Sequence, residues 1–407
     1  MSIGVAKTFA IATLTTFTTT ATINQPSSAS NINFLGIRLT DAPKVTTLTA
    51  EDLFNQGFDK QKKGDLQGAV AAYTEAIRLN PNFAEAYTNR GVVRADLGDK
   101  KGAIEDYNQA LRINPNNANA YSNRGLARAD LGDKKEAIED YNQALRINPN
   151  FADAYFHRGV ARADLGDKKG AIEDYNQALR INPNYAQAYF NRGVARADLG
   201  DKKGAIEDYN QALLINPNYA DAYIIRGDVR TQLGDKKGAI EDYNQAVRIN
   251  PNDAATYINR GNVRAQLGDN KGAIEDYNQA VRIYPNFAPV YINRGNVRTD
   301  LGDNKGAIED FNQVLRINPN SAEAYINRGN VRIGLRDSKG AIEDYSQALR
   351  INPNSAEAYT NRGSARSLLG DKKGAITDLQ QAADIFKQQG KIEDYQKVLE
   401  IINQLQK

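Results

Sequence analysis

AEAYTNRGVVRADLGDKKGAIEDYNQALRINPNN, residues 84–117, is the stretch that decides the fold of this chain. The same pattern of 34 residues begins again, lightly altered, at Ala118 and then at every thirty-fourth residue up to Ala356. A more diverged copy covers residues 50–83, so that ten copies follow one another without a gap from residue 50 to residue 389. A fixed period of this length indicates one small supersecondary unit stacked on copies of itself. We number these copies as units 1 to 10 and count positions 1 to 34 from the alanine that begins each unit.

Each unit carries the pattern of two amphipathic helices. In unit 2, apolar or small residues recur every three or four positions across 86–97 and again across 103–111, which is the spacing of one helix face. Between these segments, Gly98 can take the left-handed conformation that ends a helix, and Asp99 can accept from the free N–H groups of the next helix. The second helix should stop before Pro115. The following segment, Asn-Phe-Ala-Glu in residues 82–85, resembles a capping box for a first helix.

The residues at fixed positions of the unit resemble those of the tetratricopeptide repeat. The matching pattern is an aromatic residue at position 4, glycine at 8, alanine at 20, an aromatic residue at 24, alanine at 27 and proline at 32: Tyr87, Gly91, Ala103, Tyr107, Ala110 and Pro115. The resemblance covers residues 50–389. It implies an all-α fold, a right-handed superhelix of helix pairs, in which the first helix of each unit lines a concave groove.

Two arginines depart from that family pattern. Large apolar residues are usual at positions 7 and 11, but unit 2 has Arg90 and Arg94 there. We expect the aliphatic stems of these arginines to pack between the helices while their guanidinium groups pair with the acids of the second helix, Glu105 and Asp106.

The segments that flank the repeats differ from them in composition. Residues 1–49 are interpreted as a signal-like segment and linker: Lys7 precedes a mildly apolar run, and the small residues Thr19 and Ala21 could form a cleavage site. A cleaved secretory signal, an uncleaved tail and an organelle transit segment all remain open, with export to a periplasm or lumen favoured over a cytoplasmic location. Residues 390–407 place apolar side chains at helical spacing, which predicts a C-terminal capping helix.

Composition excludes several classes of function. The net charge is only +3, from 52 basic and 49 acidic residues, which gives no basic footprint for nucleic acid. Without cysteine and with His157 as the single histidine, the chain offers no thiol nucleophile, no zinc–thiolate site and no multi-histidine metal site. The turns read LGDKKGA, which is not a phosphate-binding loop. We therefore predict a protein that is not an enzyme, carries no cofactor or metal, and has no segment long enough to span a bilayer.

The remaining candidate site is the inner wall formed by the first helices. Asparagine recurs at position 6, and its amide offers the acceptor and donors that a peptide backbone requires; the alternative is that this asparagine was simply carried along by repeat duplication. Position 5 adds apolar side chains, position 9 changes from apolar to amide along the chain, and position 13 supplies acids. An apolar and acidic first half suits a ligand with basic and apolar residues. The candidate groove residues are Asn89, Asn123, Phe156, His157, Asp164, Phe190, Asn191, Asp198, Ile224, Asp228, Asn259, Asn262, Asn293, Asn296, Asn327, Asn330 and Asn361.

These observations predict a scaffold that binds one or more proteins or extended peptides in the groove, without catalysis. The alternative is a regulatory or assembly-factor subunit of a larger complex, possibly one associated with a membrane. Some members of the family grip the C-terminal carboxylate of chaperone tails with lysine at position 5, and no unit of this chain has lysine there. The partner, the pathway and the oligomeric state do not follow from the sequence.

Overall fold

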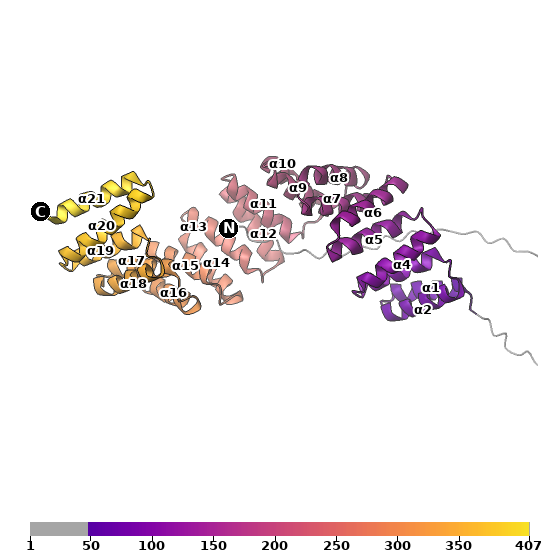
Figure 1. Ribbon diagram of the computed structural model, residues 1–407, viewed down its shortest axis with the longest axis horizontal. Helices are drawn as coiled ribbons and strands as arrows, with labels where there is room; N and C mark the ends of the chain where they lie inside the picture. The colour runs from indigo at the N-terminus through magenta and orange to yellow at the C-terminus, as the bar shows by residue number, and fades with distance from the viewer. Residues whose placement is uncertain (1–47, 407) are drawn as a thin grey trace, which may run out of the picture. The chain divides into compact units, whose positions relative to one another are not determined.

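The computed structural model describes residues 48–406, and all regular elements in that range are helices. Each of the ten units forms a helix pair, and the pairs follow one another in chain order (Figure 1). The first helices of units 1 to 10 are α1 (Ala50–Lys62), α3 (Ala84–Asp96), α5 (Ala118–Leu131), α7 (Ala152–Asp164), α9 (Ala186–Asp198), α11 (Ala220–Gln232), α13 (Ala254–Gln266), α15 (Ala288–Asp300), α17 (Ala322–Gly334) and α19 (Ala356–Leu368).

The second helices are of nearly constant length, as the strict sequence period requires. They are α2 (Leu66–Leu79), α4 (Lys100–Ile113), α6 (Lys134–Ile147), α8 (Lys168–Ile181), α10 (Lys202–Ile215), α12 (Lys236–Ile249), α14 (Asn270–Ile283), α16 (Asn304–Ile317), α18 (Ser338–Ile351) and α20 (Lys372–Gln388). A last helix, α21 (Ile392–Gln406), follows the tenth unit. The all-α repeat solenoid indicated by the sequence is therefore confirmed.

The turn inside each unit has the geometry that its sequence predicts. Gly98 has φ +88°, a left-handed conformation that ends α3. The carboxylate of Asp99 then accepts from the N–H of Gly102 at 2.9 Å and satisfies a free donor in the first turn of α4. The second helix ends at Ile113, directly before Asn114 and Pro115.

The prediction of a capping box at residues 82–85 is wrong. The N-cap of α3 is Phe83, whose side chain makes no capping hydrogen bond. The turn between units is instead held by Asn80, whose side-chain oxygen accepts from the N–H of Asn82 at 3.1 Å. A complete capping box occurs at α1, where Thr49 and Asp52 bond reciprocally.

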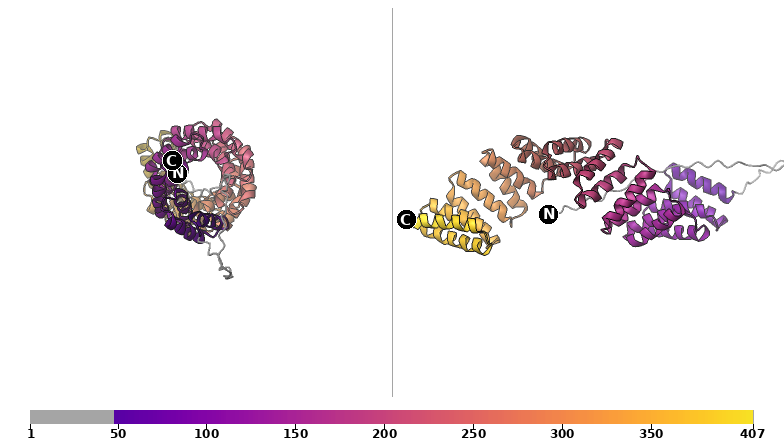
Figure 2. Two further views of the ribbon diagram at one scale, coloured as in Figure 1. Left: turned by 90° about the vertical axis from the view of Figure 1, so that its right-hand side faces the viewer. Right: turned by 90° about the horizontal axis from the view of Figure 1, so that it is seen from above.

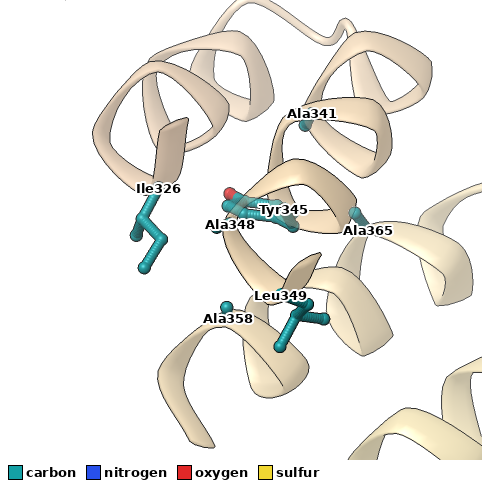
Figure 3. Packing of buried hydrophobic residues seen from close by; sticks show 7 residues of the cluster. All are labelled: Ile326, Ala341, Tyr345, Ala348, Leu349, Ala358 and Ala365. Atoms are coloured by element: carbon teal, nitrogen blue, oxygen red, sulfur yellow. The ribbon is translucent and has the colours of Figure 1, made fainter. Parts of the chain in front are cut away.

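The core of a unit depends on small residues that let large rings approach. A Cβ atom added at Gly91 would lie 2.7 Å from the ring of Tyr107, so only glycine fits at position 8. Tyr107 is 1% exposed, and Ala103 and Ala110 beside it are fully buried. Figure 3 shows the same arrangement in unit 9, where Tyr345 and Leu349 lie among alanines of two neighbouring units. Each unit therefore completes its core only against the next one.

The arginines at positions 7 and 11 hold the two helices of a unit together through one buried acid. In unit 2, Arg90 Nη2 lies 2.6 Å from Asp106 Oδ1, and Arg94 Nη1 lies 3.0 Å from Asp106 Oδ2. Asp106 is 2% exposed, whereas the adjacent Glu105 is exposed, because neighbouring helical residues face different directions. The expected pairing is thus confirmed for the aspartate. Arginine from position 7 reaches the equivalent acid in every later unit, namely Asp140, Asp174, Asp208, Asp242, Asp276, Asp310, Asp344 and Asp378.

Successive units are stacked so that their first helices lie side by side. At most junctions the first helix of one unit contacts the first helix of the next, whereas the described second helices approach their counterparts less closely. Figure 2 shows the same succession of pairs from two other sides, with each pair rotated relative to the one before it. Since the inner side of a curved stack is the shorter one, the first helices form its inner wall.

Helix α21 packs against α20 after the last unit. Val398 and Ile402 are 3% and 6% exposed and lie against Leu379, Ala382 and Ala383. These contacts cover apolar surface of α20, as a capping helix would. No helix within residues 48–406 is long and apolar enough to cross a membrane. The signal-like segment and most of the linker expected in residues 1–49 lie outside the described residues.

Candidate functional site

Asparagine at position 6 lies half-buried on the inner wall of the second half of the array. Its Nδ2 donates to the side-chain oxygen at position 9 of the preceding unit. The Nδ2 of Asn259 bonds Asp228 at 3.2 Å, and the equivalent bonds are Asn293 to Asn262 at 3.0 Å, Asn327 to Asn296 at 3.2 Å and Asn361 to Asn330 at 3.1 Å. The recurring amides therefore tie neighbouring units together, which the sequence reasoning missed.

The buried tyrosine at position 24 joins the same hydrogen-bond network. Its hydroxyl donates to the side-chain oxygen at position 9 of its own unit: Tyr243 to Asp228 at 2.7 Å, Tyr277 to Asn262 at 2.8 Å and Tyr345 to Asn330 at 2.8 Å. The side-chain oxygen at position 9 thus accepts from the tyrosine of its own unit and from the asparagine of the next unit. The sequence contains a signal for this network. In units 6 to 9 the residue at position 9 is polar, and the next unit has asparagine at position 6.

Among these acceptors, Asp228 is the only carboxylate. Burial raises its pKa, and the hydrogen bonds from Tyr243 and Asn259 oppose that shift only in part. Burial likewise raises the pKa of Tyr277 to about 12. The tyrosine hydroxyls therefore remain protonated donors at neutral pH.

The first half of the wall is built differently. Position 9 is apolar there, with Val92, Leu126, Val160 and Val194. No side-chain bond of the kind seen in the second half joins Asn123 or Asn191 to the preceding unit in the described residues. At the junction of units 5 and 6, Ile225 replaces the asparagine, and the buried hydroxyl of Tyr209 has no hydrogen-bond partner.

His157 replaces the asparagine of position 6 in unit 4. Its ring stacks on Tyr141 at 6.2 Å between centroids and meets the edge of Phe156 at 5.2 Å. Burial lowers the pKa of the imidazole, with Asp153 and Asp130 opposing the shift. The residue is therefore a neutral, ring-packed member of the wall.

Phe156, Phe190 and Ile224, which the sequence predicts as groove residues at position 5, are not exposed on the wall. Phe156 and Ile326 are each 7% exposed, while Phe190 and Ile224 are partly buried. The rings of Phe156 and Phe190 pack at 4.8 Å and 4.9 Å against Tyr185 and Tyr219, the aromatic residues that end their own units. These apolar side chains fill the space between successive first helices, so a ligand is not needed to explain them.

The acids at position 13 are exposed, but three of them are paired. Asp130, Asp164 and Asp198 form ion pairs with lysines at position 17 of the preceding unit, namely Lys100, Lys134 and Lys168. The lysine at 134 lies 2.5 Å from its acid and the one at 168 lies 2.8 Å from its acid. The attraction of a basic ligand to the first half of the wall is therefore weaker than the sequence suggested.

The described residues hold no cluster of three or more His, Cys, Asp or Glu side chains that could bind a metal ion. What the wall offers is hydrogen-bonding capacity. Asn259, Asn293, Asn327 and Asn361 each use one Nδ2 hydrogen, and their Oδ1 atoms accept no bond within the described residues.

Comparison with protein families agrees with this geometry. The family model described as "TPR repeat" matches residues 61–98, 93–132, 125–166, 161–200, 227–268, 261–299, 295–333 and 337–370, and models described as "Tetratricopeptide repeat" match 186–219 and 356–389. The chain belongs to the tetratricopeptide repeat family. Proteins of this family typically bind other proteins.

Likenesses to individual proteins add little to the family assignment. No curated protein matches this tetratricopeptide repeat chain. Among solved structures, MamA is 30% identical, with 40% of this chain and 96% of MamA covered and a TM-score of 0.38. YrrB, described as a TPR protein with an unusual peptide-binding site, is 26% identical over 44% of this chain and 93% of its own, with a TM-score of 0.39. Yeast Tom70 is 15% identical over 88% and 95%, with a TM-score of 0.40. At these TM-scores none of the three carries an argument about function.

Proposed function

We propose that this tetratricopeptide repeat array is a non-catalytic scaffold that holds an extended segment of a partner protein along the wall of first helices. The observation that carries the proposal is the orientation of the asparagine amides. In units 7 to 10 each amide is fixed by a bond to the preceding unit, while its Oδ1 atom and its second Nδ2 hydrogen stay available. A main chain in extended conformation has matching donors and acceptors.

Preorganisation supports the same proposal. Asn293 is held by Asn262, which is itself held by Tyr277. Binding therefore requires little new ordering of these side chains, and ordering a side chain at an interface costs about 0.5–1.5 kcal/mol. Contacts to the main chain would make binding tolerant of the partner's sequence, with selectivity left to neighbouring side chains.

Crosslinking of the full chain in extracts of its host, followed by capture, tests the proposal. The test variant carries Asn123→Ala and Asn191→Ala, whose side chains make no bond to the preceding unit, so that a lost partner does not reflect a broken stack. A second variant adds Asn259→Ala and Asn293→Ala. We expect both to lose the partners that the unchanged chain captures, and the second to lose more.

The matched control carries Glu173→Ala and Glu207→Ala, two exposed acids on the second helices α8 and α10. It should capture the same partners as the unchanged chain. If the asparagine variants keep their fold by circular dichroism and still capture every partner equally, the wall of first helices is not the binding surface.

A further inference from the structure

The seam between α17 and α19, the first helices of units 9 and 10, contains two hollows. One of about 270 Å³ lies toward the C-terminal ends of these helices and is lined by Asn330, Ile333, Tyr345, Asn361, Ser364 and Leu368 together with Ala365. The other, of about 250 Å³, lies toward their N-terminal ends and is lined by residues that include Ile326, Asn327, Ser355, Glu323 and Glu357. The two hollows follow one another along one seam of the inner wall.

The C-terminal hollow lies where units 9 and 10 have no acid at position 13. Position 13 is aspartate in units 2 to 5, but it is Gly334 in unit 9 and Leu368 in unit 10. Gly334 leaves open space, since a Cβ atom added there would meet nothing within 4 Å. Leu368 is 67% exposed, far more than the leucines of the core. Together with Ile333 and Ala365, Leu368 gives this hollow an aliphatic surface, which an apolar ligand group would remove from water.

The N-terminal hollow is lined by Ser355, the small residue that ends unit 9. In unit 1 the ring of Phe83 packs on Phe54 at 5.0 Å between centroids, and aromatic residues end units 4 and 5 in the same way. In unit 9 this position is Ser355, whose hydroxyl caps α19 by accepting from Ala358 N–H at 3.2 Å. No aromatic ring therefore covers Ile326 from this position, and both residues line the hollow.

The polar wall of the C-terminal hollow is fixed in orientation. Asn330 Oδ1 accepts from Tyr345 Oη at 2.8 Å and from Asn361 Nδ2 at 3.1 Å. These two bonds decide which end of each amide faces the hollow. The Nδ2 of Asn330 and the Oδ1 of Asn361 have no partner in residues 48–406, so a donor and an acceptor are ready for a peptide group.

The charge of the seam is negative. Glu323 and Glu357 line the N-terminal hollow, and neither forms an ion pair within the described residues. The nearby Arg328 and Arg332 are already bound to Asp344 at 2.5 Å and 2.9 Å. Burial raises the pKa of Tyr345, which lines the other hollow, and the charges of Asp344 and Glu357 add to that shift. A cationic ligand group fits there.

We propose that this seam is the specificity site of the scaffold and binds a partner segment that presents one aliphatic and one basic side chain. The aliphatic side chain contacts Leu368 and Ile333, the basic one lies between Glu323 and Glu357, and the amides of Asn330 and Asn361 bond the peptide group. This assignment rests on the proposed function, because it assumes that the wall of first helices receives a polypeptide.

Fluorescence anisotropy with the full chain tests the assignment. The probes are fluorescein-labelled Gly/Ser decapeptides that carry one leucine and one arginine, separated by one to five residues. The comparison peptides replace arginine by glutamate or leucine by serine. We expect at least one leucine–arginine spacing to bind, each comparison peptide to bind about tenfold more weakly, and salt to weaken only the arginine-dependent part.

Two variants of the chain test whether the peptide binds in the seam. Leu368→Asp restores the residue that most other units carry there, and Glu357→Lys reverses one charge. Each should lower the affinity about tenfold, because the apolar contact of the peptide with Leu368 or its charge pair with Glu357 is lost. Their matched controls are Leu214→Asp, at a leucine 74% exposed on α10, and Glu85→Lys, at the same position of unit 2. Both controls should bind as the unchanged chain does.

The assignment is overturned if no leucine–arginine peptide binds at millimolar concentration, or if Leu368→Asp and its control bind equally. It is also overturned if the chain dimerises by sedimentation and Leu368→Asp abolishes dimerisation, because the occupant is then a second copy. Retention of host partners by Leu368→Asp and Glu357→Lys, with loss in the asparagine variants, would refute this seam and leave the proposed function standing.

Discussion

Arg124 and Asp140 face one another between the two helices of unit 3, with Nη2 of the arginine 2.6 Å from Oδ1 of the aspartate. Arg128 approaches the other carboxylate oxygen at 2.8 Å, and the aspartate side chain is only 3% exposed. The Nη1 of Arg124 also donates to Asn108 of unit 2 at 2.6 Å. One guanidinium therefore links the helices of its own unit and also joins that unit to the preceding one.

We expect Asp140→Asn to destabilise the array by about 2–3 kcal/mol, because two partly buried guanidinium groups lose their counter-charge. Thermal melting followed by circular dichroism measures the effect, and hydrogen exchange should place it in units 2 to 4. The control is Glu139→Gln, at the exposed neighbouring acid, which should change stability by less than about 0.5 kcal/mol. Equal losses in both variants would show that Asp140 has no special role.

Two tyrosines at the same position of neighbouring units should respond oppositely to loss of the hydroxyl. Tyr243 donates to Asp228 at 2.7 Å, whereas the buried Oη of Tyr209 has no partner. Tyr243→Phe should cost about 1–2 kcal/mol, and Tyr209→Phe should be neutral or stabilising, because an unsatisfied buried hydroxyl is removed. Phe311 already occupies this position in unit 8. Urea unfolding of the two variants is the measurement, and a larger loss for Tyr209→Phe would contradict it.

The period of the sequence was enough to predict the helix pairs and their turns. Gly98 and Asp99 have the expected conformation and bond. Unit 10 has Lys387 in place of the proline of position 32, which predicts a longer second helix, and that helix runs to Gln388. These features depend on contacts within one unit. The sequence of that unit therefore contains the information needed to predict them.

What the sequence could not predict depends on the rotation of one unit against the next. That rotation places Asn361 against Asn330 and brings Lys134 to Asp164. A helical face read from one unit is solvent-exposed or buried only after its neighbour is placed. The sequence therefore predicts that the first helices line the groove, but it does not predict most of the contacts between neighbouring units.

The raised pKa of Asp228 should make the stability of the array depend on pH. Burial raises the pKa of this carboxyl above its usual 3.8 in the folded protein. The folded state therefore binds the proton more tightly than the unfolded state, so its contribution to stability is present at low pH and is lost as pH rises through the raised value. Asn262 at the same position of unit 7 makes the same two bonds without a charge.

Asp228→Asn should accordingly raise the melting temperature at pH 7.5, and the gain should shrink as the pH is lowered to about 4. Thermal melts of the variant and the unchanged chain across this range provide the measurement. Glu241→Gln, at an exposed acid on α12 of the same unit, should show no such trend. A gain that grows toward low pH would mean that the carboxyl is not held above its usual pKa.

The turn of unit 9 contains the one described non-glycine residue with a left-handed backbone, Arg336, at φ +63°. Other units have glycine at this place, such as Gly302 at φ +78°. Arg336→Gly should stabilise the protein by about 0.5–1 kcal/mol, because the strain of a Cβ atom in this conformation outweighs the greater freedom of unfolded glycine.

The reciprocal variant, Gly302→Arg, should lose a similar amount. A Cβ atom added at Gly302 meets nothing within 4 Å, so the loss would come from the backbone conformation alone. The measurement is the melting temperature of the two single variants and of the double variant. Because the two turns are separate, the two changes in stability should add. If Arg336→Gly lowers stability, the arginine side chain makes a contribution that exceeds the strain of its turn.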